Sequence, residues 1–273
     1  MSAKELTVHL ETESYMQFQE LCLLCRDQKT IGLSFGRPGA GKTEAAKKFA
    51  KWSIAEPNIA AMNRPLVQPE KLIDCEVLYY LPSITMSAPR LMTEIGILRN
   101  RFNAALQRVE QQRNSTVDFA QLLAKSYVKL LIVDEAYRLK FQALEQLRDI
   151  HDDWKIGIVL IGDPSMERSL DRQPHFADRI GFAQEFKQLQ PSEVNAYIDK
   201  QIHCLGLEKP AAEIYAAIAW YTQGNLRTLE KLFKLLDRLV KLNEDKTIKR
   251  DVLDTAREML LYGLRRTLTK CAT

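Results

Sequence analysis

The feature that most constrains this chain is the stretch GRPGAGKT at positions 36–43, which follows the short apolar run IGLSF at 31–35. The three glycines permit backbone angles that other residues resist, so successive N–H groups can point into one anion-binding hollow. The residues after the loop continue as a helix, whose N-terminus adds a positive dipole. The pattern predicts a phosphate-binding loop between a buried strand and a helix.

Two residues of this loop carry most of its chemistry. Lys42 is expected to reach the β- and γ-phosphates of a nucleotide, and Thr43 is expected to ligate Mg²⁺ through its hydroxyl. ATP and Mg²⁺ are therefore the predicted cofactors. The predicted nucleotide-binding residues run from the first glycine into the helix: Gly36, Arg37, Pro38, Gly39, Ala40, Gly41, Lys42, Thr43 and Glu44.

A second chemical feature closes the apolar run KLLIVDE at 129–135. Two carboxylates at the end of a buried strand are costly unless they meet a cation or a hydrogen-bond network. Asp134 is predicted to hold the water shell of Mg²⁺, and Glu135 to orient and polarise an attacking water. Many phosphate-loop kinases need no acid at this position, so Glu135 favours ATP hydrolysis over a monomeric small-molecule kinase.

The order of elements predicts an α/β fold. Fully apolar strands separated by helices imply a parallel sheet covered on both faces, and the helix predicted at 90–111 is one of these covers. After residue 190 the pattern is helical only. We therefore predict a nucleotide-binding domain at 1–189 and a helical lid with a C-terminal tail at 190–273. The five predicted strands are 31–35, 76–81, 129–135, 156–162 and 182–189.

Composition indicates a water-soluble protein. Apolar residues make up 46% of the chain and charged residues 27%, and no apolar run is long enough to cross a bilayer. The N-terminal segment lacks the apolar core of a secretion signal, so we expect a cytoplasmic protein with no membrane partner. Cys22 and Cys25 form a C-x-x-C whose simplest interpretation is two core-facing side chains. A metal or redox site would need a second ligand pair.

The charge is unevenly distributed. The chain has a net charge of +4, and basic segments at 81–129 and 225–273 flank an acidic one at 130–224. Such clustering can form an electrostatic footprint for nucleic acid, although solvated helix faces give the same pattern. The predicted contacts to DNA phosphates, which could instead be surface salt bridges, are Arg90, Arg99, Arg101, Arg108, Arg113 and Thr116.

From about residue 15 to residue 262 the chain resembles the AAA+ ATPase superfamily. In that family a polar "sensor 1" ends the strand after the acidic pair, and Asp163 in VLIGDP occupies this place. The alternative for Asp163 is a cap on the helix that follows. The family also places an arginine before the last strand, where it enters the neighbouring subunit's site. Arg179 matches this position, with Arg172 as a second candidate. A "sensor 2" arginine in the lid corresponds to Arg227. Each arginine could also be an exposed surface charge.

Within the superfamily, LLIVDEAYRL and GNLRTLEKL resemble the transposition regulators TnsC, TniB and Mu B. The resemblance implies assembly with ATP into a ring or helical filament around duplex DNA. Sequence specificity should be weak, because no part of the sequence resembles a helix-turn-helix or a zinc finger. It also implies recruitment of a transposase, with a TniQ-type target selector, and release on hydrolysis. In related DNA-encircling ATPases the region between the second and the acidic strand faces the central channel. The alternative function is an IstB- or DnaC-like helicase loader or another AAA+ protein remodeller.

Overall fold

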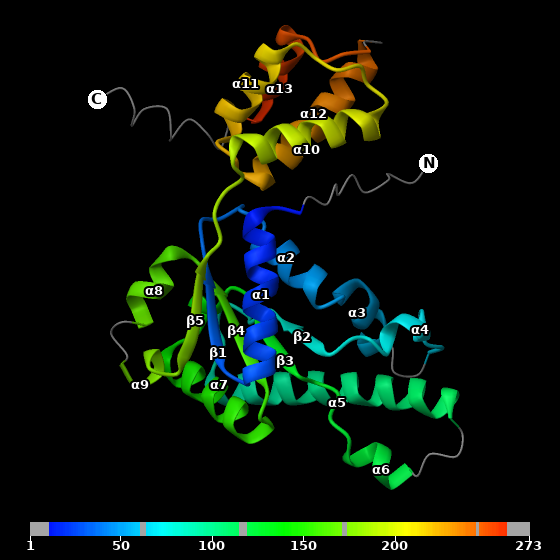
Figure 1. Cartoon of the computed structure of the whole chain (residues 1–273), viewed down its shortest axis with the longest axis vertical. Coiled ribbons are helices and arrows are strands. Elements are labelled where there is room, and N and C mark those ends of the chain that lie inside the picture. The colour runs from blue at the N-terminus through cyan, green and yellow to red at the C-terminus, as the bar shows by residue number, and fades with distance from the viewer. Residues whose placement is uncertain (1–10, 61–63, 115–118, 171–173, 244–245, 261–273) are drawn as a thin grey trace. The chain divides into compact units, whose positions relative to one another are not determined.

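The structure is a computed structural model that describes residues 11–60, 64–114, 119–170, 174–243 and 246–260. The chain divides into two compact units, whose helices and strands are labelled in Figure 1. The larger unit comprises residues 13–37 and 42–186. The smaller comprises residues 187–273 together with residues 1–12 and 38–41. No helix in the described ranges is long and apolar enough to cross a membrane.

A five-stranded parallel sheet forms the centre of the larger unit, in the order β2-β3-β4-β1-β5. The predicted α/β fold is confirmed. The apolar runs form strands because both faces of the inner strands are covered, and β1, β3 and β4 are buried along almost their whole length. The strands are β1 (Ile31–Phe35), β2 (Val77–Tyr80), β3 (Leu130–Val133), β4 (Gly157–Gly162) and β5 (Ile180–Glu185).

The fifth strand begins earlier than predicted. We expected it at 182–189, whereas it runs from Ile180 to Glu185. Its register against β1 shifts between Ile31 and Gly32, so the pairing passes over Gly181. The irregularity adds a residue that no hydrophobic pattern shows. As an edge strand, β5 also alternates partly buried and exposed side chains, which blurs its apolar signal.

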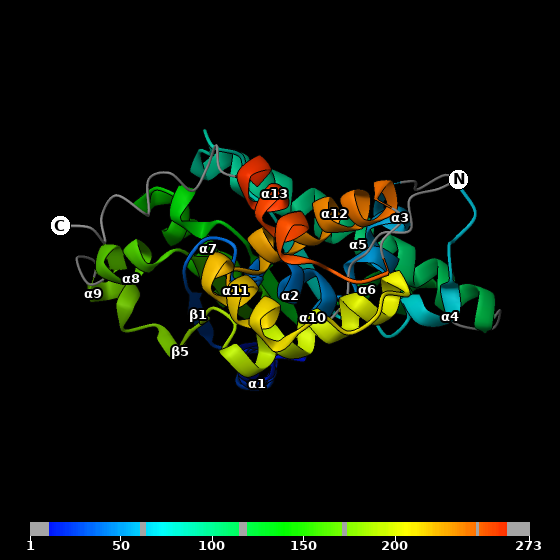
Figure 2. The ribbon, with the colours of Figure 1, turned by 90° about the horizontal axis from the view of Figure 1, so that it is seen from above.

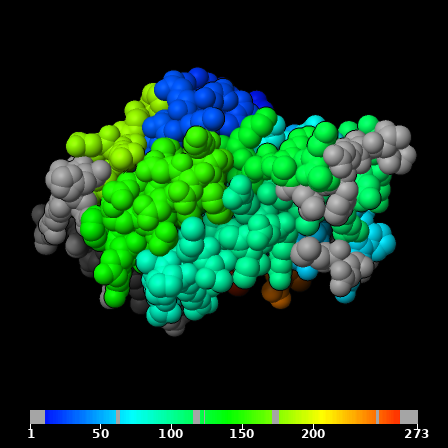
Figure 3. Space-filling view, turned by 90° about the horizontal axis from the view of Figure 1, so that it is seen from below, coloured from blue at the N-terminus to red at the C-terminus, as the bar shows by residue number. Residues whose placement is uncertain are grey.

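Helices cover the sheet, and Figure 3 shows α5 and α7 side by side on the surface of this unit. The predicted helix at 90–111 is present within α5, and its apolar stripe is buried at Leu91, Ile95 and Phe102. The helical elements of this unit are α1 (Glu13–Gln28), α2 (Lys42–Phe49), α3 (Trp52–Ala60), α4 (Pro69–Leu72), α5 (Ala88–Arg113), α6 (Phe119–Ala124), η1 (Ala136–Arg138), α7 (Phe141–Trp154), α8 (Pro164–Leu170) and α9 (Pro174–Ala177).

In the described part of the smaller unit, helices pack around a core of their own, and Figure 2 shows them from above. Tyr197 and Phe233 meet edge to face at the centre of this core, with ring centroids 5.8 Å apart. The leucine-rich stripe of the helix at Leu226–Leu242 is packed core, because Leu229, Leu232 and Leu236 are buried. The helices are α10 (Pro191–Leu205), α11 (Ala212–Thr222), α12 (Leu226–Leu242) and α13 (Arg250–Leu260).

The C-x-x-C pair lies where α1 packs on the sheet. Cys22 and Cys25 are both buried, which confirms that they are core-facing, and burial raises the pKa of the Cys25 thiol to about 12. The backbone of α1 approaches β4 so closely that a Cβ at Gly157 would lie 2.2 Å from the Cys25 carbonyl oxygen. Glycine at position 157 therefore sets the distance between this helix and the sheet.

Replacing that glycine should destabilise the larger unit. We expect Gly157→Ala to lower the free energy of unfolding by about 1–3 kcal/mol, because the added methyl meets backbone that cannot move cheaply. Urea unfolding followed by circular dichroism measures this loss. Gly96→Ala is the matched control, since a Cβ at Gly96 would meet nothing within 4 Å beyond its chain neighbours and the backbone of its own helix. The control should equal or exceed the wild type, because alanine favours the helix. If Gly157→Ala is as stable as the wild type, the close packing is wrong.

Candidate nucleotide-binding and hydrolysis site

The glycine-rich loop has the backbone that phosphate binding requires. Gly39 and Gly41 have φ angles of 81° and 107°, in the region where other residues are strained. The helix α2 begins at Lys42, directly after the loop. The Lys42 ammonium donates to the carbonyl oxygens of Gly36 at 2.6 Å and Arg37 at 3.0 Å, so it lies over the loop. Phosphate oxygens would give this cation stronger, charge-assisted partners.

The end of β3 meets the start of α2, although 91 residues separate them in sequence. The Thr43 hydroxyl donates to Oδ2 of Asp134 at 2.7 Å, and Asp134 is buried. A hydroxyl and a carboxylate beside a phosphate-binding loop fit Mg²⁺, which takes one or two protein oxygens and completes its shell with phosphates and water. Thr43 and Asp134 are therefore the residues that would hold this ion.

Tyr79 on β2 is a member of the site that the sequence analysis missed. Its hydroxyl donates to the same Asp134 oxygen at 2.9 Å, and its ring packs on Trp52 with centroids 5.6 Å apart. Burial and the neighbouring Asp134 carboxylate raise the pKa of Tyr79 well above its usual range, so the phenol stays a donor. The two tyrosine hydroxyls in the otherwise apolar run VLYY indicate that this strand needs polar partners. The sequence does not identify those partners, because they depend on which strand lies beside β2.

Glu135 lies at the carboxyl edge of the sheet, immediately beyond the buried aspartate. Its backbone N–H donates to Oδ1 of Asp134 at 2.8 Å, which holds the Asp134 carboxylate against the backbone of Glu135. Its φ angle is 52°, an uncommon value for a residue with a side chain. Its carboxylate accepts hydrogen bonds from Tyr137 and Arg138. The structure thus brings together Lys42, Thr43 and the acidic pair at one edge.

Asp163 caps a helix in this structure. Its carboxylate accepts from the backbone N–H of Ser165 at 2.8 Å and from the Ser165 hydroxyl at 2.5 Å, as an N-cap of α8 does. We expected a sensing role for Asp163 ahead of a capping role, and the contacts are those of the cap. The sensing role stays a prediction.

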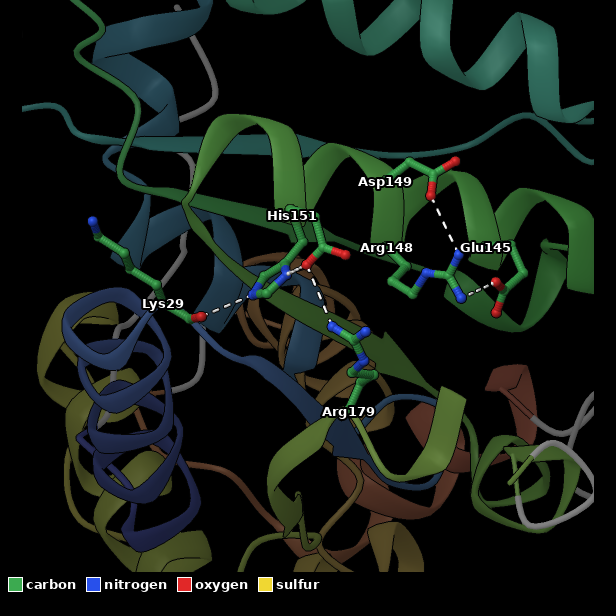
Figure 4. A network of polar contacts seen from close by, with 7 residues as sticks. Lys29, Glu145, Arg148, Asp149, His151 and Arg179 are labelled. Atoms are coloured by element: carbon green, nitrogen blue, oxygen red, sulfur yellow. Dashed lines mark hydrogen bonds and ion pairs between the residues drawn. The ribbon is translucent and has the colours of Figure 1, made fainter. Parts of the chain in front are cut away.

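Arg179 lies at the amino edge of the sheet, where the parallel strands begin, whereas the glycine-rich loop follows the carboxyl edge, where they end. It directly precedes β5, whose first residue pairs with the first residue of β1. Its guanidinium contacts Asp152 at 3.4 Å, and Asp152 also contacts His151 at 2.9 Å (Figure 4). Arg179 and Asp152 are about half exposed, so their ion pair contributes little to stability.

Arg227 is exposed in the first turn of α12, in the smaller unit, and its sensor role stays a prediction. Arg172, the second candidate for an intersubunit arginine, lies outside the described residues.

The predicted DNA-contacting arginines differ in their surroundings on α5. Arg99 stacks on Trp154 at 4.1 Å from the ring centroid, and burial lowers the pKa of Arg99. Arg90 pairs with Glu94 at 2.7 Å, and Arg101 is exposed. Arg99 is thus the least accessible of these three to a phosphate backbone. Arg108 and Arg113 donate to the backbone carbonyls of residues 64 and 70, and Thr116 is not among the described residues.

Comparison with known proteins places the chain in a family. A family profile described as "AAA domain" matches residues 25–170, and the chain belongs to this family. A "Potential ATP-binding protein" of Staphylococcus aureus is 30% identical over 267 residues, which cover 94% of this chain and 97% of that protein. The "Mu-like prophage FluMu DNA transposition protein B" of Haemophilus influenzae is 27% identical over 160 residues, or 58% of this chain and 47% of that protein.

Solved structures share the fold. The Thermotoga maritima RuvB Holliday junction branch migration motor aligns with a TM-score of 0.57 at 17% identity, covering 91% of this chain and 69% of that one. The Aeropyrum pernix ORC2 protein aligns with a TM-score of 0.59 at 15% identity, covering 92% of this chain and 68% of that one. The chain is therefore an ATP-binding protein of the AAA type, with the α/β fold of these structures.

Removing the Tyr79 hydroxyl should weaken the metal site. We expect Tyr79→Phe to raise the Mg²⁺ concentration that half-saturates ATP binding by about tenfold or more, because residues that orient a ligand contribute on this scale. Titration with a fluorescent ATP analogue at varied Mg²⁺ measures the change. Tyr80→Phe is the control, since the Tyr80 hydroxyl binds Glu94 and not Asp134. Equal half-saturating Mg²⁺ in both variants would remove Tyr79 from the site.

Proposed function

We propose that this protein is an ATP-dependent, DNA-binding regulator of DNA transposition. With ATP it assembles on duplex DNA, it then recruits a transposase to the target, and ATP hydrolysis releases it. The observation that carries the proposal is the acidic pair: buried Asp134 contacts Thr43 at 2.7 Å, and Glu135 follows it at the same edge as Lys42. This arrangement suits a nucleotide switch. The residues that bind ATP lie beside the carboxylate whose role in hydrolysis would end the ATP-bound state.

Each residue at this edge has a separate task in hydrolysis. Lys42 balances the phosphate charge, while Thr43 and Asp134 hold Mg²⁺, which when bound neutralises charge on the β- and γ-phosphates. Glu135 orients a water whose oxygen attacks the γ-phosphorus, and it accepts a proton as the bond to the β-phosphate oxygen breaks. The products are ADP and inorganic phosphate. The carboxylate of Glu135 thus adds a group that activates water to a loop that by itself only binds the nucleotide.

Two observations support the DNA part of the proposal. The long helix α5 carries arginines that remain exposed, of which Arg101 is one, and long cations bind a phosphate backbone without reading sequence. A relative at 27% identity is named as a DNA transposition protein. The transposase and a TniQ-type target selector are the protein partners that this function requires.

Glu135→Gln should separate DNA binding from release. The amide keeps the shape of the side chain but cannot accept the proton, so ATP stays bound and the assembly persists. We expect the wild type to bind duplex DNA with ATP and leave as phosphate accumulates. The variant should stay bound with little phosphate release, as fluorescence anisotropy and a phosphate assay report.

Lys42→Ala is the control for this experiment and should bind neither ATP nor, in its presence, DNA. Failure of the wild type to bind DNA with ATP would contradict the proposal. Capture of a replicative helicase by the same protein would then favour the helicase loader.

Arg179 should complete the site of a neighbouring subunit. It precedes β5 at the amino edge of the sheet, whereas the phosphate loop follows β1 at the carboxyl edge. The five residues of β1 separate these edges by about 16 Å, so Arg179 cannot reach the phosphates of its own subunit. An arginine supplied in trans is worth about 10³–10⁵ in rate. Arg179→Ala should therefore keep ATP binding and lose most hydrolysis.

Mixing variants tests whether the arginine acts in trans. Arg179→Ala mixed with Lys42→Ala should recover part of the hydrolysis, because the second variant supplies an intact Arg179 to an intact nucleotide site. Asp152→Asn is the matched control: it breaks the ion pair but leaves the arginine, so it should keep hydrolysis. If this control behaves as Arg179→Ala does, Arg179 acts through Asp152 within its own subunit.

A further inference from the structure

The catalytic carboxylate of Glu135 is already occupied in this structure. Its Oε2 atom accepts hydrogen bonds from the Tyr137 hydroxyl and from Nη2 of Arg138, the latter at 3.2 Å. Both donors lie in the turn that directly follows β3. The hydrogen bond to Glu135 raises the pKa of Tyr137, so this phenol remains a donor. A carboxylate that serves a cation and a phenol has less capacity to polarise water.

Arg138 has a second partner in the segment that follows β2. Its Nη1 atom donates to the carbonyl oxygen of Pro82 at 3.1 Å. The planar guanidinium therefore joins Glu135 to the segment 81–87, which connects β2 with α5, and its fork geometry suits two acceptors at once. Arg138 is only about one-quarter exposed, and Glu135 about one-third, so water screens this pair only in part.

The segment 81–87 is itself connected to a predicted DNA-contacting arginine. The hydroxyl of Tyr80, two residues before Pro82, donates to Glu94 at 2.7 Å. Arg90 holds the other oxygen of the same carboxylate at 2.7 Å. The hydrogen bond from Tyr80, with help from Arg90, lowers the pKa of Glu94, so it stays ionised as their common partner. A DNA phosphate that binds Arg90 would compete with Glu94 for this guanidinium, and Glu94 also contacts Tyr80 just before the segment 81–87 begins.

We propose that Arg138 is a positioning residue that holds Glu135 at rest and ties it to the segment 81–87, so that DNA binding at Arg90 frees the carboxylate for hydrolysis. The inference rests on the proposed function and names the regulation of that same site. Arg138 touches neither nucleotide nor water in this scheme. It sets whether Glu135 can turn toward them.

The test is the steady-state ATPase of Arg138→Ala with and without duplex DNA. Without DNA we expect kcat to rise roughly three- to tenfold at unchanged KM, since the typical net strength of one hydrogen bond, here partly screened by water, corresponds to about this factor in rate. Added DNA should then stimulate the variant less than it stimulates the wild type. A merely structural role would lower kcat and would not raise it.

Two further variants make the result specific. Arg148→Ala is the matched control, because Arg148 also pairs with a glutamate three residues before it, Glu145, at 2.5 Å (Figure 4). Its kcat and DNA response should equal those of the wild type. Arg138→Lys can hold Glu135 or the Pro82 carbonyl but not both through one fork, so it should keep a low kcat without DNA and lose part of the DNA stimulation.

The outcomes separate this inference from the proposed function. If Arg138→Ala has the kcat of the wild type or a lower one without DNA, while Glu135→Gln behaves as expected, Arg138 does not restrain Glu135 and the proposed function stands. If kcat rises but DNA stimulation is unchanged, the tie to the segment 81–87 is wrong. If the wild type binds no DNA, the proposed function fails, whereas the rise in kcat still reports the restraint.

Discussion

The site depends on the hydrogen bond between Thr43 and Asp134. This bond can form because β1, β4 and β3 are parallel. Parallel neighbours end at the same edge, so the loop after β1 and the acidic pair after β3 meet there although they are far apart in sequence. The aspartate is buried at the point where a divalent cation can offset its charge. Tyr79 from the next strand supplies a further donor that keeps this carboxylate oriented.

The acidic pair divides into a fixed residue and a movable one. Asp134 is buried and held by Thr43 and Tyr79, whereas Glu135 is partly exposed and lies on a backbone with φ of 52°. A non-glycine residue in this conformation costs on the order of 1 kcal/mol, and the surrounding contacts must compensate for it. The donors from the η1 turn do so at the carboxylate itself. The same contacts that stabilise this turn thus also occupy the carboxylate that we propose activates water.

The carboxyl and amino edges of the sheet carry different sets of charged residues. The carboxyl edge holds the lysine, the threonine and the acidic pair, while the amino edge holds Arg179 with Asp152 and His151. An exposed ion pair such as this one adds little to stability, so the arginine is available to a stronger anionic partner. The geometry excludes the nucleotide of its own subunit as that partner, and this is why assembly is central to the proposed function.

Much of the fold and the core of the site could be predicted from the sequence, because their signals are local. Glycine spacing specifies the backbone of the loop at Gly39 and Gly41, and unbroken apolar runs specify buried parallel strands. The acidic pair could be recognised for the same reason, since carboxylates at the end of such a run require a cation or hydrogen-bond donors. The edge strand β5 was placed two residues late, because the irregularity at Gly181 leaves no trace in hydrophobicity.

Only the tertiary structure decided the partners of each side chain. That Tyr79 serves Asp134, and that Arg138 spans Glu135 and the Pro82 carbonyl, follows from β2 lying beside β3 in the sheet. Likewise Asp163 caps α8, and Arg99 stacks on Trp154, although each residue type allowed another role. A sequence determines which groups a residue can offer. Which groups it meets depends on strand order and helix packing, because hydrogen bonds and ion pairs act over only a few ångströms and their partners come from distant parts of the chain.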